Sequence, residues 1–401
     1  WNIHKEAFLA NSQFVNELKL RGSYGQVGND GGIGAEPGYQ VDLDLYSLGY
    51  NNGGESGVYL GQVGNPNLTW ESKNSFDVGV DFSLLKRRIS GSIEYYLQDI
   101  SDMIFAEPVP NSAGVPGNSI YRNIGKMRNN GLELSLNIGI VRNDKFSWDL
   151  GLVAASNKNE MIKMPKGKDD AIISGTKRIA EGRSLYDFWL RQWYGVDPAD
   201  GAGLFIQDPT KGSDGNSRTV NGVLMTTNHN NALYAYSGSS IPDVFGSISN
   251  TFKYGNFDLN VMLNYQLGGK TYDSNYASLM NGYAQGQSQH VDMLGAWKKA
   301  GDITNVPILS TSNYTSVGAQ SSRFLVKSDY LSIKSAQIGY NFDKKLLDTV
   351  GLRNFRVYVA GENLYAWTAK KGLEPSQSFS GTTTYRYTPS RTVSLGVNVS
   401  F

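Results

Sequence analysis

Alternation of apolar and polar residues with a period of two is the feature that most constrains this chain. It is clearest at the C-terminus, where Val393, Leu395, Val397, Val399 and Phe401 are apolar and the residues between them are small or polar. Successive side chains of a β-strand point to opposite faces of the sheet. The segment therefore predicts a strand with one apolar and one polar face.

The same alternation predicts nine further strands, most of them joined in pairs by short links. Their apolar positions are Leu18, Leu20, Gly22 and Tyr24; Phe76, Val78, Val80, Phe82 and Leu84; Ile89, Gly91, Ile93, Tyr95 and Leu97; Leu132, Leu134, Leu136, Ile138 and Ile140; Phe146, Trp148, Leu150 and Leu152; Val244, Ile248 and Phe252; Phe257, Leu259, Val261, Leu263 and Tyr265; and two runs within 330–342 and 355–367. Within 330–342 the apolar residues move from odd to even positions, which predicts a β-bulge near Ser335.

The links between the predicted strands sort by length. Those at 85–88, 142–145 and 254–256 are short, and those at about 28–68, 107–120, 162–242, 275–327 and 369–387 are long and fall on the other side. Transmembrane β-barrels of outer membranes have short periplasmic turns and long extracellular loops. The fold predicted is therefore an all-β transmembrane antiparallel barrel, with extracellular loops and a periplasmic C-terminus.

Composition supports a barrel over a helical membrane protein. No run of about 18 apolar residues is present, so a membrane-spanning helix is not expected. Aromatic residues near the predicted strand ends, such as Tyr95, Trp148, Tyr340 and Trp367, fit the two aromatic girdles of such barrels. The net charge of +1 gives no basic field for nucleic acid.

No pattern in the sequence indicates catalysis. His4, His229 and His290 are scattered over a terminus and two predicted loops, so neither a metal cluster nor a Ser/His/Asp arrangement is indicated, and we expect neither an enzyme nor a cofactor. Asp197, Asp200 and Asp208 have a spacing that suits calcium. Asp and Gly also stabilise tight turns, and we favour the turn interpretation, which leaves no metal site.

The long loops carry the candidate binding residues. Aromatic side chains cluster in two of them, at Tyr186, Trp189, Trp193, Tyr194, Tyr283 and Trp297. Such clusters mark binding surfaces, although packing of the loops on one another explains them equally well. Loops of this length are expected to bury little apolar surface alone. Basic residues in the predicted loops are interpreted as a solvated surface near lipopolysaccharide: Lys166, Lys168, Lys298, Lys299, Lys370 and Lys371.

Seven short segments in this order resemble a known family. They are residues 18–29 (LKLRGSYGQVGN), 65–71 (NPNLTWE), 129–134 (NNGLEL), 195–201 (GVDPADG), 297–307 (WKKAGDITNVP), 328–334 (SDYLSIK) and 361–365 (GENLY). Together they resemble the SusC-like (SusC/RagA) TonB-dependent transporters of the Bacteroidetes. Phe401 is similar to the C-terminal aromatic signal that the barrel-assembly machinery reads. Each motif alone is weak, but the set covers nearly the whole chain.

The resemblance implies more than the alternation does. It implies that residues 1–401 are the last ten strands of a 22-stranded barrel, with the signal peptide and plug domain outside this chain. The partners that it implies are the TonB complex, a SusD-type lipoprotein over the extracellular face, and an oligosaccharide or, second, an oligopeptide as ligand. A closed ten-stranded barrel remains the structural alternative. A passive porin, or a structural or adhesive barrel, remains the functional one.

Overall fold

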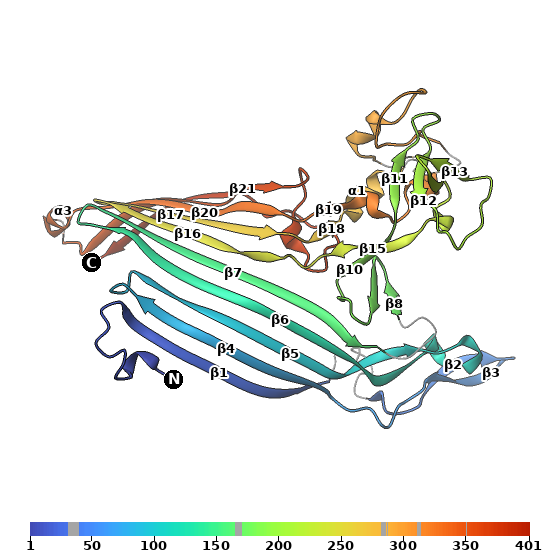
Figure 1. The fold of residues 1–401 in the computed structure, drawn as a ribbon, viewed down its shortest axis with the longest axis horizontal. Coiled ribbons are helices and arrows are strands. Elements are labelled where there is room, and N and C mark those ends of the chain that lie inside the picture. Colours follow the sequence, from blue (N-terminus) through green and yellow to red (C-terminus); the bar gives the residue numbers. More distant parts are fainter. Residues whose placement is uncertain (31–39, 165–170, 282–285, 287, 311–313, 350) are drawn as a thin grey trace. The chain divides into compact units, whose positions relative to one another are not determined.

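Ten long strands form one antiparallel sheet in the computed structural model, which describes all residues except 31–39, 165–170, 282–285, 287, 311–313 and 350 (Figure 1). Their hydrogen-bonded order is β1-β4-β5-β6-β7-β16-β17-β20-β21-β22. The bounds are β1 Val15–Asn29, β4 Glu71–Leu84, β5 Ile89–Pro108, β6 Ser119–Arg142, β7 Phe146–Lys163, β16 Val244–Tyr254, β17 Phe257–Leu267, β20 Tyr330–Asn341, β21 Asn354–Thr368 and β22 Thr392–Ser400. All ten predicted strands are present, and β1 and β22 are the edges of this sheet.

Contacts group the chain into two compact units. The first comprises Trp1–Leu136, Ala155–Ile172 and Ile179–Leu185, and the second comprises Asn137–Ala154, Ile173–Arg178 and Tyr186–Phe401. Tyr283, Lys166 and Lys168 lie outside the described residues.

In the first unit the strand register places the predicted apolar residues on one face. Leu18 pairs with Phe82 and Leu20 with Val80 between β1 and β4, and Val80 pairs with Ile93 between β4 and β5. Paired residues in a sheet share a face. We call this the apolar face, and the opposite face of the sheet the inner face. The predicted side-chain orientations are confirmed for these strands.

In the second unit the apolar face continues across five strands. Phe252 pairs with Leu259, and Leu259 with Ile338, along β16, β17 and β20. The register then shifts on either side of Lys334, which confirms the bulge predicted near Ser335. Asn250 is the polar exception on this face, and it accepts a hydrogen bond from Trp148 Nε1 at 3.2 Å. That bond matters because an unpaired amide facing lipid is costly.

Aromatic side chains gather near both ends of the apolar face. At the end with short turns, Phe252 stacks with Phe146 and Trp148, and Phe257 contacts Tyr340 edge to face, with ring centroids 4.9 Å apart. At the end with long loops, Tyr365 and Trp367 contact each other at 4.7 Å and are about half exposed. This arrangement fits the two interfacial girdles of a membrane barrel.

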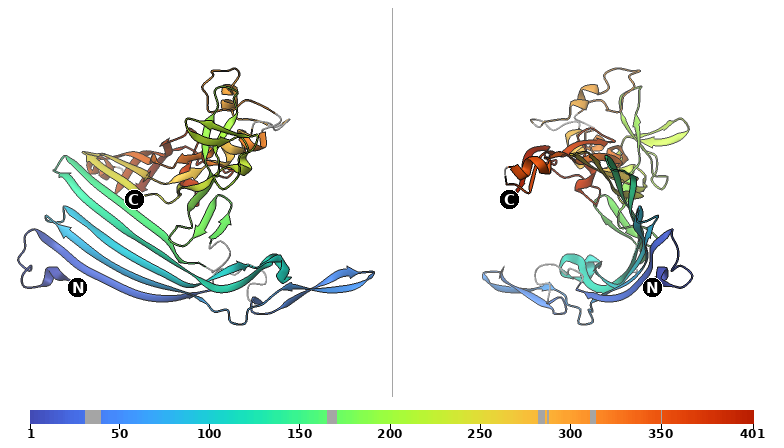
Figure 2. Two further views of the ribbon diagram at one scale, coloured as in Figure 1. Left: turned by 45° about the vertical axis from the view of Figure 1, so that its right-hand side comes forward. Right: turned by 90° about the vertical axis from the view of Figure 1, so that its left-hand side faces the viewer.

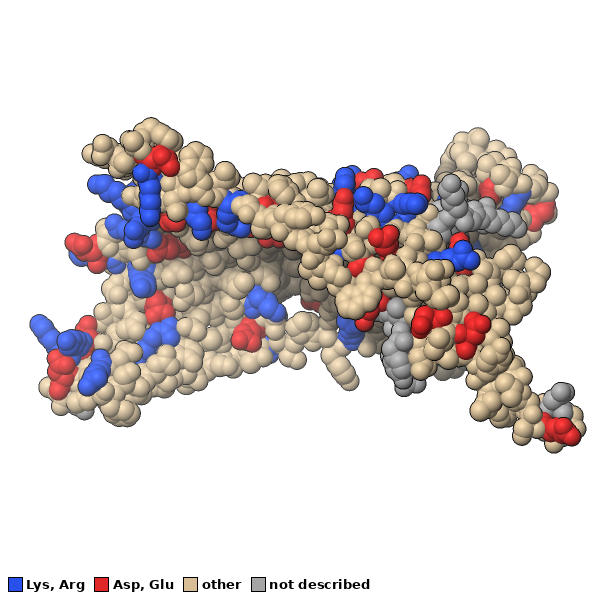
Figure 3. Space-filling view, turned by 90° about the horizontal axis from the view of Figure 1, so that it is seen from below, with Lys and Arg blue, Asp and Glu red and all other residues tan. Residues whose placement is uncertain are grey.

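The inner face carries ion pairs instead. In the first unit, Arg21 of β1 bonds Asp81 of β4 at 3.1 Å and Glu94 of β5 at 2.5 Å. In the second, Arg356 of β21 bonds Asp258 of β17 at 2.5 Å. On the face shown in Figure 3, basic and acidic side chains lie close together in small groups, with long uncharged stretches between them. A polar inner face suits a water-filled lumen.

The strands of the first unit extend farther than the alternation predicted. β5 has 20 residues and β6 has 24, whereas a membrane crossing needs only about 9–11. Leu97 is the last large apolar residue in the alternating run on the apolar face of β5. The next residue on that face, Asp99, pairs with two cations of β6, Arg128 Nε at 2.7 Å and Lys126 Nζ at 3.6 Å. The change from apolar to charged residues on one face marks where the lipid-facing band ends. Beyond it, hairpin β2–β3 (Leu45–Asn52 and Glu55–Gln62) reaches away from the ends of β1 and β4 (Figure 2).

Short elements in the long links complete the fold, and periodicity did not predict them. The strands are β8 Ala171–Ser174, β9 Lys177–Ala180, β10 Asp187–Arg191 and β15 Tyr234–Ser239 in one sheet; β11 Trp193–Val196, β12 Gly203–Ile206, β13 Ser217–Val220 and β14 Val223–Thr226 in another; and β18 Lys270–Tyr272 with β19 Leu325–Lys327. The α-helices are α1 Ser274–Leu279, α2 Tyr314–Val317 and α3 Lys344–Thr349. The 3-10 helices are η1 Ile3–Lys5, η3 Asn111–Ala113, η4 Pro116–Asn118, η5 His229–Asn231, η6 Val291–Gly295, η7 Ser322–Phe324 and η8 Pro375–Gln377. No helix in the described part of the chain is long and apolar enough to cross a membrane.

Two long links pack together into what we call the loop lobe, residues 186–243 and 268–329. Its core is a cluster of buried side chains: Phe188, Leu190, Tyr272, Ala277, Met280, Met293, Ala296, Val306 and Phe324. The expectation that these loops bury little apolar surface was therefore wrong. Phe188 and Leu190 come from the first link and the other seven residues from the second, so the core is built by both links.

A labelling experiment tests the predicted orientation of the strands. The chain has no cysteine, so single cysteines can be placed at Asp144, in the short turn between β6 and β7, and at Ser213, in a long loop; both residues are exposed. On intact cells an impermeant maleimide is expected to label the Ser213→Cys variant and not the Asp144→Cys variant. Both should react after the outer membrane is permeabilised. The reverse pattern on intact cells would invert the topology.

Candidate functional site

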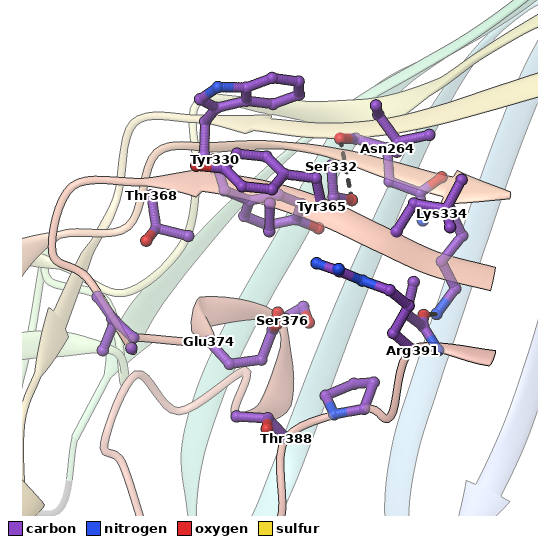
Figure 4. A pocket seen from close by; sticks show the side chains of 18 of the residues that line it. Asn264, Tyr330, Ser332, Lys334, Tyr365, Thr368, Glu374, Ser376, Thr388 and Arg391 are labelled. Carbon is purple, nitrogen blue, oxygen red and sulfur yellow. Dashed lines mark hydrogen bonds between the residues drawn. The ribbon is translucent and has the colours of Figure 1, made fainter. Parts of the chain in front are cut away.

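A cavity of about 690 Å³ lies on the inner face of β20 and β21, beneath the link that joins β21 to β22 (Figure 4). The strands contribute inner-face residues, among them Tyr330, Ser332, Ala366 and Thr368, and the lining also includes Ile333, Tyr365 and Trp367 of the apolar face. The link folds back over them and contributes residues 371–376 and 388–391, including η8. We call this space the inner cavity.

Small polar groups make up much of its lining. Hydroxyls come from Ser332, Thr368, Ser376 and Thr388, and an amide comes from Asn264 of β17. Asn264 Oδ1 is buried and accepts no hydrogen bond from any described residue. A buried acceptor without a partner is costly, so water or a ligand donor is expected to occupy that position.

Charges of both signs line the inner cavity, but cations outnumber anions. Lys334, Lys371 and Arg391 are the cations and Glu374 is the one carboxylate in the lining. Glu374 accepts a hydrogen bond from Ser376 Oγ at 2.5 Å, and Figure 4 shows the Arg391 guanidinium extending into the space between the strands and η8. Among the described residues, no carboxylate forms an ion pair with any of the three cations.

The bulge in β20 positions the first of these cations. Lys334 sits between the two register segments of β20, and its Nζ donates to Asn363 Oδ1 at 2.7 Å. Asn363 adopts φ 50°, a left-handed conformation that asparagine tolerates better than most residues, and its amide donates to Ser390 O at 3.0 Å. Bulges commonly redirect a side chain next to a functional site, and here the bulge directs a lysine into the cavity.

A second cavity of about 250 Å³ shares Lys371, Gly372, Leu373, Glu374 and Thr388 with the first. Here Lys370 Nζ contacts Asp273 Oδ2 at 3.0 Å and lies over the ring of Tyr276. Burial lowers the pKa of Lys370, although Asp273 opposes that shift. Burial and the neighbouring Asp292 raise the pKa of Tyr276 to about 12, so its hydroxyl remains a hydrogen-bond donor at neutral pH.

The predicted loop aromatics lie in the loop lobe, where most of them pack against other loop residues. Trp189 stacks with Tyr234 and lies beneath Arg178, and Trp193 contacts Phe205 and Arg323. Tyr186 packs edge to face on Phe379, and Trp297 Nε1 donates to Pro198 O at 3.1 Å. Tyr194 is 44% exposed and accepts a hydrogen bond from Asn221. Of the described members, Tyr194 alone is classed as exposed.

The acidic loop around residues 197–208 forms turns, as the sequence favoured. Asp197 and Asp200 each accept a hydrogen bond from a backbone N–H two residues ahead, and both bind Arg218 Nη1, at 2.9 and 2.8 Å. Asp208 accepts in the same way from Thr210. The bond from the Ala199 N–H lowers the pKa of Asp197, so the carboxylate is charged and already satisfied.

Two partly buried cations contribute to the packing in and beside the loop lobe. Lys177 Nζ donates to Tyr186 O at 2.6 Å and lies over the ring of Phe188, and burial lowers its pKa to about 7. Arg323 donates to the carbonyls of Val317 and Asn305 and packs on Trp193, and burial lowers its pKa to about 10. These contacts are internal, so we assign both residues to packing.

The sequence did not single out most residues of the inner cavity. Lys370 and Lys371 were interpreted as solvated loop lysines, and Lys334 and Asn363 lay within family-like segments without an assigned role. The only feature of the sequence that pointed to this site was the shift of apolar residues from odd to even positions near Ser335. It located the bulge but not the cation that the bulge positions.

A sheet with one apolar face, one polar face and long links between its strands is the architecture of an outer-membrane β-barrel protein. The model of the family described as TonB dependent receptor-like, beta-barrel matches residues 9–268. The chain belongs to this family, whose members are outer-membrane proteins.

Curated proteins of the same family align with the whole of this chain. A TonB-dependent receptor of Formosa agariphila is 29% identical over 433 residues, and the TonB-dependent receptor SusC of Bacteroides thetaiotaomicron is 25% identical over 417. Both alignments include 100% of this chain but only 41% and 39% of the relatives. The chain thus spans about two fifths of the length of the curated relatives that it matches.

Solved structures share the fold. The RagAB peptide importer in its closed-closed state matches with a TM-score of 0.83 and 23% identity, over 100% of this chain and 42% of that one. Its open-open state matches with a TM-score of 0.81 and 22% identity, over the same shares of the two chains. At this identity the match establishes the fold of the chain.

Proposed function

We propose that this chain forms part of the barrel wall of an importer that takes up oligomeric nutrients, works with a SusD-type surface lipoprotein and is driven by TonB. The observation that carries the proposal is the inner cavity, a polar space on the inner face of strands whose opposite face is apolar. Such a cavity lies where a solute would pass through the barrel. Membership of a TonB-dependent family supports the energy source.

The proposed cargo is an oligosaccharide, with an oligopeptide as the alternative. The cavity lining includes hydroxyls from Ser332, Thr368, Ser376 and Thr388 and the amide of Asn264, and these groups suit the many hydroxyls of a glycan. The related SusC is named as a TonB-dependent receptor, and the RagAB structures are titled as a peptide importer. The lining therefore favours sugar, while one of the structural relatives carries peptide.

Uptake in cells tests the importer proposal against a passive porin. The full-length gene is expressed in a strain that lacks other routes for a fluorescent oligosaccharide, with and without a functional tonB gene. We expect accumulation against a gradient that requires tonB and stops when a protonophore is added. Entry that equilibrates and ignores both treatments would establish a passive pore and overturn the proposal.

The loop lobe is the proposed docking surface for the lipoprotein. Although it buries its own core, it exposes large apolar side chains, including Val291 (67%), Leu294 (77%) and Ile303 (97%). Isolated exposed apolar residues are ordinary, but several on one lobe suit a partner interface. The proposal places the lipoprotein over these residues.

Charge substitutions test this docking surface without disturbing the lobe core. We expect Leu294→Asp together with Ile303→Asp to reduce the lipoprotein that co-purifies with the barrel at least tenfold, because each buries a charge at an apolar contact. Asp144→Lys, in a short turn, is the matched control and should leave the complex unchanged. If the double variant still co-purified with as much lipoprotein as the unaltered barrel does, these residues would lie outside the interface.

A further inference from the structure

The excess of cations in the inner cavity has a consequence for the ligand. The two cavities together are lined by Lys334, Lys370, Lys371, Arg386 and Arg391, against the carboxylates of Asp273 and Glu374. Asp273 is already paired with Lys370 at 3.0 Å, and Arg386 donates to the Gln377 carbonyl. The uncompensated positive charge is therefore concentrated on Lys334, Lys371 and Arg391.

Two arginines elsewhere on the inner face are matched by carboxylates within the sheet. Arg21 binds two carboxylates, and Arg356 binds Asp258. Around the inner cavity the nearest further carboxylate on β21, Glu362, lies outside the lining. Cations left without carboxylate partners in a partly enclosed space attract an anion more strongly than the same cations in open water.

All three cations are exposed at the cavity, and Lys334 is held in place by a hydrogen bond to a neighbouring amide side chain. Lys334 sits at a bulge and is fixed by Asn363, whose left-handed φ of 50° is stabilised by its own bond to Ser390. Arg391 follows directly after Ser390, at the start of β22. A hydrogen-bonded unit of Lys334, Asn363 and Ser390 thus positions Lys334 at the cavity, and Arg391 is the next residue of the chain after this unit.

From this geometry we propose that the inner cavity binds an acidic oligosaccharide, one that carries carboxylate or sulfate groups. The cations recognise the acidic groups. The hydroxyls of Ser332, Thr368 and Thr388 and the unpartnered Asn264 Oδ1 recognise sugar hydroxyls. This inference rests on the proposed importer function and specifies its substrate class.

Direct binding to the detergent-purified full-length transporter tests the inference. The probes are tetragalacturonate, its neutral methyl ester, a sulfated neutral tetrasaccharide and tetraglutamate, measured by calorimetry at low and high salt. We expect tetragalacturonate, the sulfated sugar or both to bind at least tenfold more tightly than the methyl ester, with a preference that weakens as salt rises. The two acidic sugars distinguish carboxylate from sulfate recognition.

Variants locate the effect in the cavity. Lys334→Gln and Arg391→Gln are each expected to weaken binding of the acidic sugar about tenfold, since each removes one charged hydrogen bond. Glu374→Gln should strengthen it, a gain that misfolding cannot produce. Lys344→Gln, on the exposed surface of α3, is the matched control and should leave affinity unchanged.

Three results would overturn the inference. Equal affinity for tetragalacturonate and its methyl ester would show that charge is not recognised. Unchanged affinity in all three cavity variants would place the acidic ligand elsewhere, and tighter binding of tetraglutamate would make the site a peptide site. If the transporter still accumulates a neutral oligosaccharide in a TonB-dependent manner, only the substrate assignment fails; if it accumulates nothing in that manner, the importer proposal fails as well.

Discussion

Replacing Val261 by arginine is expected to destabilise the folded barrel by about 2–4 kcal/mol, because a charge near the middle of a lipid-facing strand loses its water. Val261 lies on the apolar face of β17, where it pairs with Asn250 and Ala336. The measurement is equilibrium unfolding of the full-length protein in lipid vesicles. The expected cost is a large fraction of the net stability of a protein.

The neighbouring residue provides the control. Met262 points to the inner face, is 39% exposed and pairs with Ser249 and Ser335, so an arginine there can reach water. We expect Met262→Arg to cost well under half as much as Val261→Arg. Equal costs for the two variants would mean that the two faces of β17 have been assigned wrongly.

Truncating Phe324 to alanine is expected to cost about 3–5 kcal/mol of local stability in the loop lobe. Phe324 is 1% exposed and packs against Tyr272 and Tyr276 in the core that both long links share. Hydrogen exchange should accelerate in β10, β18 and α1, which contribute to that core. Exchange in β16 and β17 should be unaffected, because their hydrogen bonds lie within the main sheet.

An exposed apolar residue of the same lobe gives the comparison for this variant. Leu294 is 77% exposed, so Leu294→Ala should change exchange by less than the equivalent of about 0.5 kcal/mol. If Phe324→Ala also left the lobe protected from exchange, the buried cluster would not be the source of its stability. The two links would then have to be ordered by something else, such as a partner.

The membrane strands could be predicted from the sequence because their environment imposes the alternation. Lipid on one face and water on the other require a period of two, and residues such as Leu259 and Asn260 satisfy it locally. The bulge at Lys334 was predictable for the same reason, since an extra residue reverses the phase of the pattern. What the alternation could not give was strand length, because β5 continues beyond Leu97 and β6 begins well before Leu132, in segments where apolar and polar residues no longer alternate.

The loop lobe and the inner cavity were beyond such reasoning because they depend on contacts between distant segments. Phe188 and Phe324 meet in one core although they belong to different links, so no local pattern marks either as buried. The aromatic residues were correctly noticed, but whether a ring such as Trp189 packs internally or faces a ligand depends on Tyr234 and Arg178, which the sequence does not place. Lys334 of β20 and Arg391, which directly precedes β22, line one cavity although they are far apart in the sequence.

The most direct test of the central claim, a membrane-spanning sheet with one lipid face and one aqueous lumen face, is spin-label scanning along β17. Because the chain has no cysteine, single cysteines can be introduced and labelled one by one from Phe257 to Leu267 in the vesicle-embedded full-length protein. We predict that oxygen, which partitions into lipid, reaches the odd positions best, whereas a water-soluble nickel chelate reaches the even positions best. Accessibility without a period of two, or chelate access at the odd positions, would contradict the account.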